Sequence, residues 1–454
     1  MNSLERRAVA ALAGVFSLRM FGLFLVLPMM ALYAAELEGA TPLMVGLALG
    51  IYGLTQAIFQ IPFGMLSDRY GRKPLIVVGL LIFLVGSVVA ALAEEVFGVI
   101  IGRALQGSGA IAAVILALVA DLTREQQRIK AMALMGMSIG ASFLAALMIG
   151  PVLDQWFGMS GLFWLTAVLS VAAIGVVLRF VPAPSRTALD PGVRAVGKYF
   201  ADVLRDHQLL RLDIGILILH MVLTAMFVAI PFSLVGVLGL ERDAHWEIYV
   251  PVLIVSILLM APLLITSMRR QNTFAVFRVA IAILTLAFII LLLSSTTAVL
   301  LVIGLCVFFV GFNLLEAMLP SLVTRIAPGY AKGTATGVYN TFEFSGVFMG
   351  GAVGGMLYGS FGVTGVFCFC AIASAAWLVV SFSGPRPVLH ESLTLYLDDD
   401  FTDVTAIEKA LRSLVGVHDV SLFFKERVAY LRIDAEEFDR NQLNQINGLV
   451  RSQS

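Results

Sequence analysis

The sequence predicts an all-α polytopic membrane protein with twelve transmembrane helices in two six-helix pseudo-repeats, followed by a small α+β domain. Hydrophobic residues make up 59% of the 454 residues and charged residues 13%, whereas about a quarter of an ordinary soluble chain is charged. The charge is also unevenly placed, because residues 391–454 hold 12 of the 30 acidic residues. This composition excludes a soluble globular enzyme, and we expect no enzymatic activity.

Twelve apolar segments of spanning length, which is about 20 residues, recur along the chain. Six precede a polar, proline-containing stretch and six follow it, at about 8–33, 42–66, 74–93, 96–120, 130–153, 160–181, 212–238, 247–268, 275–294, 297–321, 333–358 and 363–383. The first is too long for the apolar core of a signal peptide, so we interpret it as a span. The predicted domains are two transmembrane halves, a linker and a C-terminal domain, at 1–181, 212–385, 182–211 and 386–454.

The linker is expected to be cytoplasmic and to contain an interfacial helix, because apolar residues recur at helical spacing between Lys198 and Arg205. Basic residues gather in the loops on the linker's side of the membrane, and the positive-inside rule makes that side cytoplasmic. The opposite loops are mainly acidic, and Arg242 is their clear exception. We therefore expect a multi-pass protein of the bacterial inner membrane with both termini in the cytoplasm.

The C-terminal domain has a different periodicity. Leucines alternate with polar residues from Leu393 to Leu397, as in a strand with one buried face. A helix, two strands and a last helix follow, at Asp403–Leu414, Val420–Phe424, Val428–Ile433 and about 437–450. This order fits a ferredoxin-like fold. The passage 414–420 is similar to the heavy-metal-associated version of that fold, but the domain has no cysteine, so we expect no metal site there.

The loop after the second span is the most specific motif. It reads Gly64-Met-Leu-Ser-Asp68-Arg69-Tyr-Gly71-Arg72-Lys73. A carboxylate, three cations and two glycines at a membrane boundary allow a tight turn that sets charges against neighbouring helix ends. The loop resembles the signature loop of the major facilitator superfamily, G-x-x-x-D-R-x-G-R-K, at every defining position.

The resemblance implies a gate. In that family the Asp matching Asp68 faces the N-terminus of span eleven, and the Arg matching Arg72 pairs with an acid at the end of span four, here Asp121. The cluster would hold the two halves closed on the cytoplasmic side and favour the outward-facing state; its members are Gly64, Asp68, Arg69, Gly71, Arg72, Lys73 and Asp121. The alternative is that the three cations only fix topology, which would not require the acid and the glycines at these positions.

Two further sequence elements resemble those of particular branches within this superfamily. Arg103-Ala-Leu-Gln106-Gly107 in span four is similar to an element of proton-coupled members, and an intramembrane Arg normally faces a partner or a water-filled cavity. Span five carries a helix-packing face similar to that of the drug:proton antiporter branch, formed by Gly136, Gly140, Gly150 and Pro151. With its C-terminal domain, the chain resembles the bacterial YajR-like transporters.

Ionisable residues inside apolar segments are candidates for proton coupling, because proton uptake needs a group that is neutral in a low-dielectric cavity and ionises when wetted. Glu316, Glu343 and His220 fit this description, with Arg19 and Arg103 as fixed cations. A structural role stays open, since His220 could bond a backbone carbonyl and Glu316 could be permanently paired with an Arg. We expect at least one of the two acids to change protonation during turnover, with protons as the coupling ion and no other cofactor or metal.

Polar and aromatic residues within the spans are candidate substrate contacts: Gln56, Gln60, Asn313, Asn340 and Phe342. Such side chains also serve in packing, which is the alternative role. The expected partners are the lipid bilayer, a small-molecule substrate and a ligand or protein partner of the C-terminal domain. The charge of residues 391–454, about −5, argues against nucleic acid.

The leading function is secondary active transport, as proton-coupled antiport (efflux) of small, amphipathic compounds by alternating access of the two halves. No G-x-x-x-x-G-K-[ST] loop is present, so the energy should come from an ion gradient. A nutrient permease, proton-coupled or facilitative, is one alternative. A membrane sensor that signals through its C-terminal domain is an alternative of another class.

Overall fold

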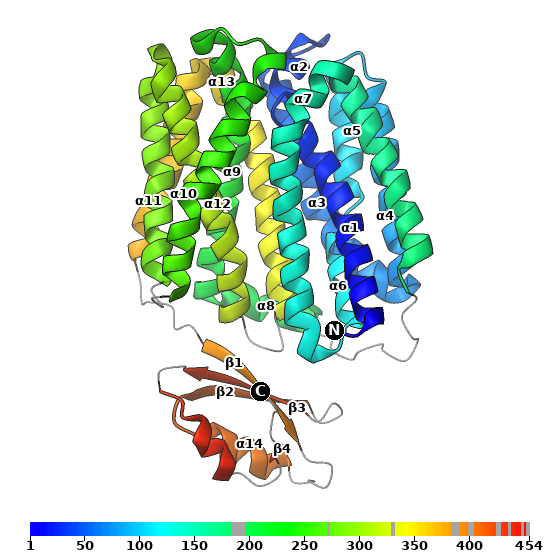
Figure 1. The fold of residues 1–454 in the computed structure, drawn as a ribbon, viewed down its shortest axis with the longest axis vertical. Coiled ribbons are helices and arrows are strands. Elements are labelled where there is room, and N and C mark those ends of the chain that lie inside the picture. Colours follow the sequence, from blue (N-terminus) through cyan, green and yellow to red (C-terminus); the bar gives the residue numbers. More distant parts are fainter. Residues whose placement is uncertain are drawn as a thin grey trace. The chain divides into compact units, whose positions relative to one another are not determined.

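A computed structural model gives the fold of the chain (Figure 1). It describes residues 1–182, 196–269, 273–327, 332–383, 390–397, 404–423, 428–434, 437–445 and 449–450. The chain divides into two compact units. The first contains Met1–Asp190, Ile214–Ala317 and Asn340–Phe382, and the second contains Pro191–Asp213, Met318–Tyr339 and Ser383–Ser454.

Long apolar helices dominate the described residues. Ten of them are long and apolar enough to cross a membrane, so the chain is a multi-pass membrane protein. The helices are α1 (Ser3–Leu25), α2 (Met30–Glu36), α3 (Pro42–Tyr70), α4 (Arg72–Ala91), α5 (Val96–Ser108), α6 (Ala112–Leu122), α7 (Glu125–Phe180), α8 (Val196–Arg205), α9 (His207–Leu238), η2 (Arg242–Ala244), α10 (Trp246–Arg269), α11 (Thr273–Leu292), η3 (Leu293–Thr296), α12 (Ala298–Ile326) and α13 (Lys332–Phe382).

Two of these helices are each a pair of spans. The apolar part of α7, Lys130–Phe180, has 51 residues and would extend about 75 Å as one helix, more than twice the thickness of a bilayer core. The chain instead turns at Gly158, where φ is 63°, and α13 turns in the same way at Gly362, where φ is 64°. Glycine has no Cβ and adopts these angles without strain. Counting both parts of α7 and α13, the described residues contain twelve spans, the number predicted.

Local sequence explains several helix ends. Asn2 and Glu5 form a capping box at the start of α1, which satisfies backbone N–H groups that the first turn leaves open. Thr41 caps α3, and Pro42 is its first residue, a position where a proline loses no helical hydrogen bond. Gly71 ends α3 with φ 96°, so the tight turn predicted for the signature loop is confirmed.

Two predicted spans are interrupted. The segment predicted at 8–33 is α1 followed by a turn and the short α2, and the segment predicted at 96–120 is α5 and α6. The second break lies at Gly109, whose ψ of 55° is not helical. A Cβ at Gly109 would lie 2.3 Å from the carbonyl oxygen of Gly79, so the backbone here packs directly on α4.

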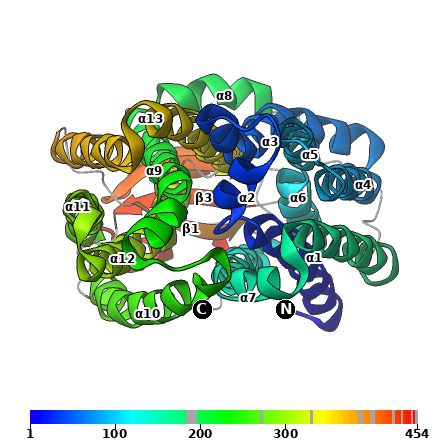
Figure 2. The same ribbon diagram turned by 90° about the horizontal axis from the view of Figure 1, so that it is seen from above.

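The two transmembrane halves lie side by side within the first unit. Figure 2 shows the helices of residues 1–182 next to the helices that follow residue 214, seen along their axes. In the first half α1 packs on α7, and α5 packs between α3 and α4. The core of this half contains Phe16, Tyr52 and Phe83, and Phe344 of α13 packs against it from the second half.

The second unit contains the C-terminal domain. Its strands β1 (His390–Leu397), β2 (Val417–Phe423), β3 (Val428–Asp434) and β4 (Leu449–Val450) form an antiparallel sheet in the order β2-β3-β1-β4, with α14 (Val404–Arg412) between β1 and β2. Leu395 pairs with Ala429, and both lie in the domain core.

The helix predicted at about 437–450 is wrong in this domain. The described part is the 3-10 helix η5 (Arg440–Gln445) followed by β4. The segment contains Asn441, Asn444, Asn447 and Gly448, and these residue types favour turns because asparagine competes for backbone hydrogen bonds and glycine loses more entropy.

Candidate functional site

The signature loop forms an ion-pair cluster between α3, α4 and α6. Arg72 pairs with Asp68 one turn away, and its Nε lies 3.1 Å from Oδ2 of Asp121. Arg72 also donates to the hydroxyl of Ser67 at 2.6 Å. The Arg72–Asp121 contact that the family resemblance implies is therefore present, and it fixes the start of α4 to the end of α6.

The other residues of the signature loop make contacts outside this ion-pair cluster. Lys73 donates to the carbonyl oxygen of Val181 at 2.7 Å, which ties the start of α4 to the end of α7. Arg69 is stacked on its neighbour Tyr70 at 5.4 Å, and a Cβ at Gly64 would meet no atom within 4 Å. Described ion pairs of the loop all lie within the first half, and the expected position of Asp68 facing span eleven stays a prediction.

A second ion pair at the same end of the bundle was not predicted. The Glu5 side chain is 3% exposed, and its Oε1 accepts from Arg124 Nε at 2.9 Å and from the backbone N–H of Arg124 at 3.0 Å. These hydrogen bonds raise the pKa of Arg124, because they favour its charged form. The pair joins α1 to the start of α7. The capping pattern Asn2-x-x-Glu5 shows that Glu5 begins a helix but not that it binds Arg124.

Arg19 is a buried cation at the break between α5 and α6. Arg19 is 1% exposed, and its Nη2 donates to Gln56 Oε1 and to the Gly109 carbonyl oxygen, both at 2.9 Å. The guanidinium also lies over Phe83, 5.4 Å from the ring centre. The helix break thus exposes a backbone acceptor that Arg19 uses.

The predicted substrate contacts Gln56 and Gln60 are buried within the first half in this conformation, and their contact with substrate stays a prediction. They are 0% and 1% exposed, and Gln56 donates to Gln60 while accepting from Arg19. Both amides are used within the first half because the buried guanidinium needs acceptors. Gln56 thus holds Arg19 directly, and Gln60 in turn accepts from Gln56.

Arg103 is the second buried cation of this half. It donates to the Ala48 carbonyl oxygen at 3.3 Å and to Gln106 Oε1 at 2.9 Å, and Gln106 donates to Ser87 at 2.9 Å. The guanidinium lies 5.2 Å from the ring centre of Tyr52. Within the described ranges, no carboxylate lies within ion-pair distance of Arg19 or Arg103.

The second half holds the complementary group of residues, which we call the His–Glu cluster: His220 on α9, Glu316 on α12 and Glu343 on α13. His220 Nε2 lies 3.6 Å from Glu343 Oε1 and 3.9 Å from Glu316 Oε2. The side chains are 10% exposed for His220, 37% for Glu316 and 23% for Glu343. The structure therefore brings together all three titratable residues predicted for proton coupling.

Among the described residues, the His–Glu cluster has no Lys or Arg as an ion-pair partner. Its two ion pairs in the part of the chain that the structure describes both involve the imidazole. Glu316 Oε2 is buried without a hydrogen-bond partner. The three ligand atoms lie within 4.8 Å of one another, so one shared cation, a proton included, could bridge them.

The remaining candidate substrate contacts lie beside this cluster. Asn313 precedes Glu316 by three residues on α12, and Asn340 precedes Glu343 by three on α13, so each amide shares a helix face with an acid. All are half-buried, as is Phe342. Asn313 donates to Ser256 Oγ at 3.4 Å. Phe312 packs on the His220 ring at 5.9 Å.

The glycines predicted as a packing face of span five separate into two sets. A Cβ at Gly150 would lie 2.5 Å from the Leu25 carbonyl oxygen, so Gly150 and the following Pro151 lie where α7 contacts α1. A Cβ at Gly136 or Gly140 would meet no atom within 4 Å. In this conformation only the Gly150 end of the face is in close helix contact.

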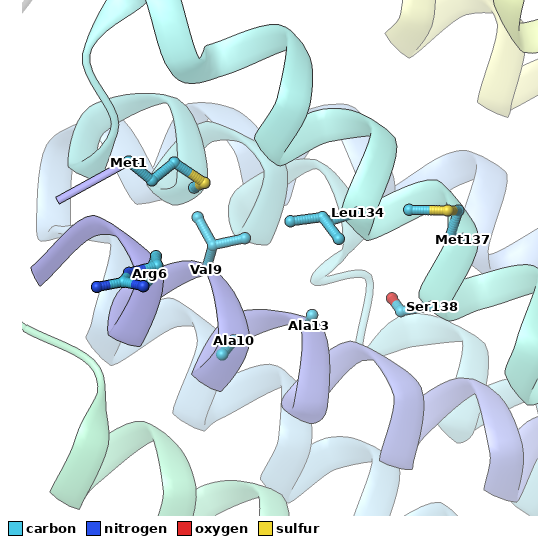
Figure 3. A pocket seen from close by; sticks show the side chains of 8 residues that line it. All are labelled: Met1, Arg6, Val9, Ala10, Ala13, Leu134, Met137 and Ser138. Carbon is cyan, nitrogen blue, oxygen red and sulfur yellow. The ribbon is translucent and has the colours of Figure 1, made fainter. Parts of the chain in front are cut away.

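An apolar recess of about 400 Å³ lies between α1 and α7 (Figure 3). It is lined by residues of α1 and α7: Met1, Arg6, Val9, Ala10, Ala13, Leu134, Met137 and Ser138. None of the predicted coupling residues lines it. The recess shows that α1 and α7 leave space between them near the chain's first residues.

Comparison with known proteins finds relatives along most of the chain. A model described as Major Facilitator Superfamily matches residues 12–351. The inner membrane transport protein YajR of Escherichia coli is 42% identical over 441 residues, which cover 97% of each chain. The multidrug resistance protein MdtH of Yersinia enterocolitica is 27% identical over 337 residues, which cover 73% of this chain and 81% of MdtH.

Solved structures give the same architecture. A bacterial homologue of the human lysosomal transporter Spinster, in an inward-facing and occupied conformation, superposes with a TM-score of 0.67 at 14% identity. The match covers 84% of this chain and 96% of that one. At this identity the similarity concerns the fold.

Proposed function

The chain belongs to the Major Facilitator Superfamily and is a secondary transporter, and from this premise we propose that it exports small amphipathic compounds in exchange for protons. The two halves alternate in exposing a central site to either side of the membrane. Protons are the coupling ion, and the His–Glu cluster binds them.

The His–Glu cluster is the single observation that carries the proposal. Two carboxylates and an imidazole lie within 4.8 Å of one another inside apolar helices, with no Lys or Arg paired to them among the described residues. Two neighbouring carboxylates in a low-dielectric site repel each other and lose hydration, so the site favours holding at least one proton. A site that must hold a proton when closed and can release it when wetted is a coupling site.

The charge arrangement also supports exchange. Arg19 and Arg103 are held by amide and carbonyl oxygens in the first half, so the positive charge there is fixed. The exchangeable charge lies in the second half. A cationic, amphipathic compound that approaches Glu316 and Glu343 compensates their ionised form, which allows the bound proton to leave.

Two observations support the substrate class. Phe312 packs on His220, and Phe143 of the first half packs on Phe312 at 5.7 Å, so aromatic surface from both halves lies beside the cluster. The relative MdtH is named a multidrug resistance protein. Aromatic surface next to acids suits lipophilic cations.

The proposal includes the orientation and the C-terminal domain. Both termini face the cytoplasm, because the basic loops lie on that side. The sheet order β2-β3-β1-β4 with α14 after β1 supports a ferredoxin-like fold for the domain. Its role is to bind a ligand or a protein partner.

The experiment is proton movement in everted membrane vesicles, followed with a pH-sensitive dye. An established acidic interior is challenged with a panel of lipophilic cations and small polar drugs, and vesicles without the protein give the background. Dissipation of the gradient by a compound only when the protein is present supports antiport. A panel that leaves the gradient unchanged, with folded and inserted protein, contradicts it.

Variants connect the result to the cluster. Glu316→Gln and Glu343→Gln remove the exchangeable protons and keep the side-chain size, and we expect one or both to abolish the dye response. Glu94→Gln makes the same change at an exposed acid between α4 and α5 and should leave the response intact. Equal responses in all three variants and the parent would remove the cluster from the mechanism.

A further inference from the structure

Arg242 is a cation at the end of the bundle where the sequence places few basic residues. It lies on η2, between α9 and α10 in the second half. Its Nε is 2.8 Å from Asp154 Oδ2 of α7, and its Nη1 is 3.6 Å from Glu36 Oε2 at the end of α2. Both acids belong to the first half, so Arg242 connects the halves.

The Arg242–Asp154 contact is shielded from water. The Asp154 side chain is 2% exposed and that of Arg242 is 26% exposed, whereas Glu36 is 72% exposed. A buried, well-aligned ion pair is screened little by salt, and loss of one partner leaves a buried charge uncompensated. The Glu36 contact is longer and exposed, and such pairs contribute little. Asp154 is therefore the main partner.

The halves also touch closely on the other side of this same end. The first turns of α3 pack on the middle of α13 through glycines, since a Cβ at Gly46 would lie 2.1 Å from the Gly351 carbonyl oxygen. A Cβ at Gly355 would lie 2.5 Å from the Pro42 carbonyl oxygen. Helix backbones this close leave no passage between them. The two halves are therefore in direct contact at this end of the bundle, which we call the closed end.

At the opposite end, the ion pairs of the described residues do not join the halves. These ion pairs, Arg72 with Asp68 and Asp121 and Arg124 with Glu5, each lie within the first half. The described ion pairs that join the two halves are those of Arg242. The electrostatic contact between the halves thus lies at the closed end.

We propose that Arg242 and Asp154 form a latch that stabilises the conformation closed at this end, and that the latch opens when the halves separate there during transport. Arg242 is a positioning residue, because it acts on the equilibrium between conformations and touches none of the proposed coupling residues. The latch explains why a cation is present in a loop that the topology does not require to be basic. It does not depend on which ion or compound is transported.

The test is the distance between two spin labels at the closed end, measured by pulsed electron paramagnetic resonance on the full-length protein. The labels are attached to cysteines that replace Glu94 of the first half and Val299 of the second, which are both exposed. The native Cys306, Cys368 and Cys370 are replaced by alanine. Arg242→Gln should lower the ratio of molecules with the closed distance to molecules with the open distance by roughly tenfold, which corresponds to about 1.4 kcal/mol.

Further variants separate a latch from a general loss of stability. Arg242→Lys keeps the cation and should keep most of the closed population, and Glu36→Gln should change little. The exchanged pair Arg242→Asp with Asp154→Arg should restore closed distances relative to Arg242→Asp alone. An unchanged distance distribution in folded Arg242→Gln protein, or equal shifts for Arg242→Gln and Glu36→Gln, would overturn the proposal.

Discussion

The close contact of α3 with α13 predicts the effect of adding a single methyl group. In Gly46→Ala the new Cβ would lie 2.1 Å from the Gly351 carbonyl oxygen and 2.8 Å from Gly355 Cα. Both atoms belong to backbone and cannot rotate away, so the helices must separate by about 1 Å to reach ordinary van der Waals distance. Overpacking of this kind costs about 1–3 kcal/mol.

That cost applies only to the conformation in which α3 and α13 touch. The ratio of closed to open molecules should therefore fall roughly 5- to 150-fold, which the Glu94/Val299 label pair measures directly. Gly175→Ala is the matched control, because a Cβ there meets no atom within 4 Å and the gain in helix propensity is the same. If Gly46→Ala and Gly175→Ala gave the same distance distribution, the close contact would not govern this equilibrium.

Three further changes test other parts of the structure. Arg72→Ala leaves two acids without their cation, so the free energy of unfolding should fall by about 1–3 kcal/mol and the thermal unfolding temperature in detergent should fall with it. Arg72→Lys should recover part of this loss, and equal unfolding temperatures of the two variants would show that the cluster is not stabilising. Glu5→Gln weakens the contacts to Arg124, so amide hydrogen exchange should rise in the first turns of α1, and exchange equal to that of Glu94→Gln would refute the contact. Leu431→Ala creates a cavity in the core of the C-terminal sheet, where Leu431 is 1% exposed, and should destabilise it by about 2–5 kcal/mol; limited proteolysis should cut the domain faster, and unchanged cleavage would contradict this core.

The arrangement of spans could be predicted because it depends on the length of apolar segments. The tight turn at Gly71 could also be predicted from the signature loop, and the pairing of Arg72 with Asp121 from the family resemblance. The breaks in spans one and four were not, because hydropathy averages over a segment and Gly109 interrupts its helix through a contact with the backbone of α4. The same contact determines where Arg19 finds its acceptor.

The candidate site likewise contains features that the sequence could predict and features that it could not. Glu316, Glu343 and His220 could be selected one by one because ionisable residues are rare in apolar helices. Their meeting depends on how α9, α12 and α13 pack, which spacing along one helix does not reveal. Gln56 and Gln60 were assigned to substrate because their polarity is visible in the sequence, whereas their use by Arg19 is not. Glu5 and Arg124 lie outside the apolar segments, where charged residues are common, and nothing in their sequence context pairs them.

Proton release from the purified protein tests the central claim most directly. Tetraphenylphosphonium or ethidium is added to the protein in weakly buffered detergent solution, and the pH change is recorded against Glu316→Gln, Glu343→Gln and the control Glu94→Gln. The account predicts release of protons on binding to the parent and to Glu94→Gln, and loss of release in at least one of the two cluster variants. Binding of either compound without proton release, or equal release from the cluster variants, would contradict it.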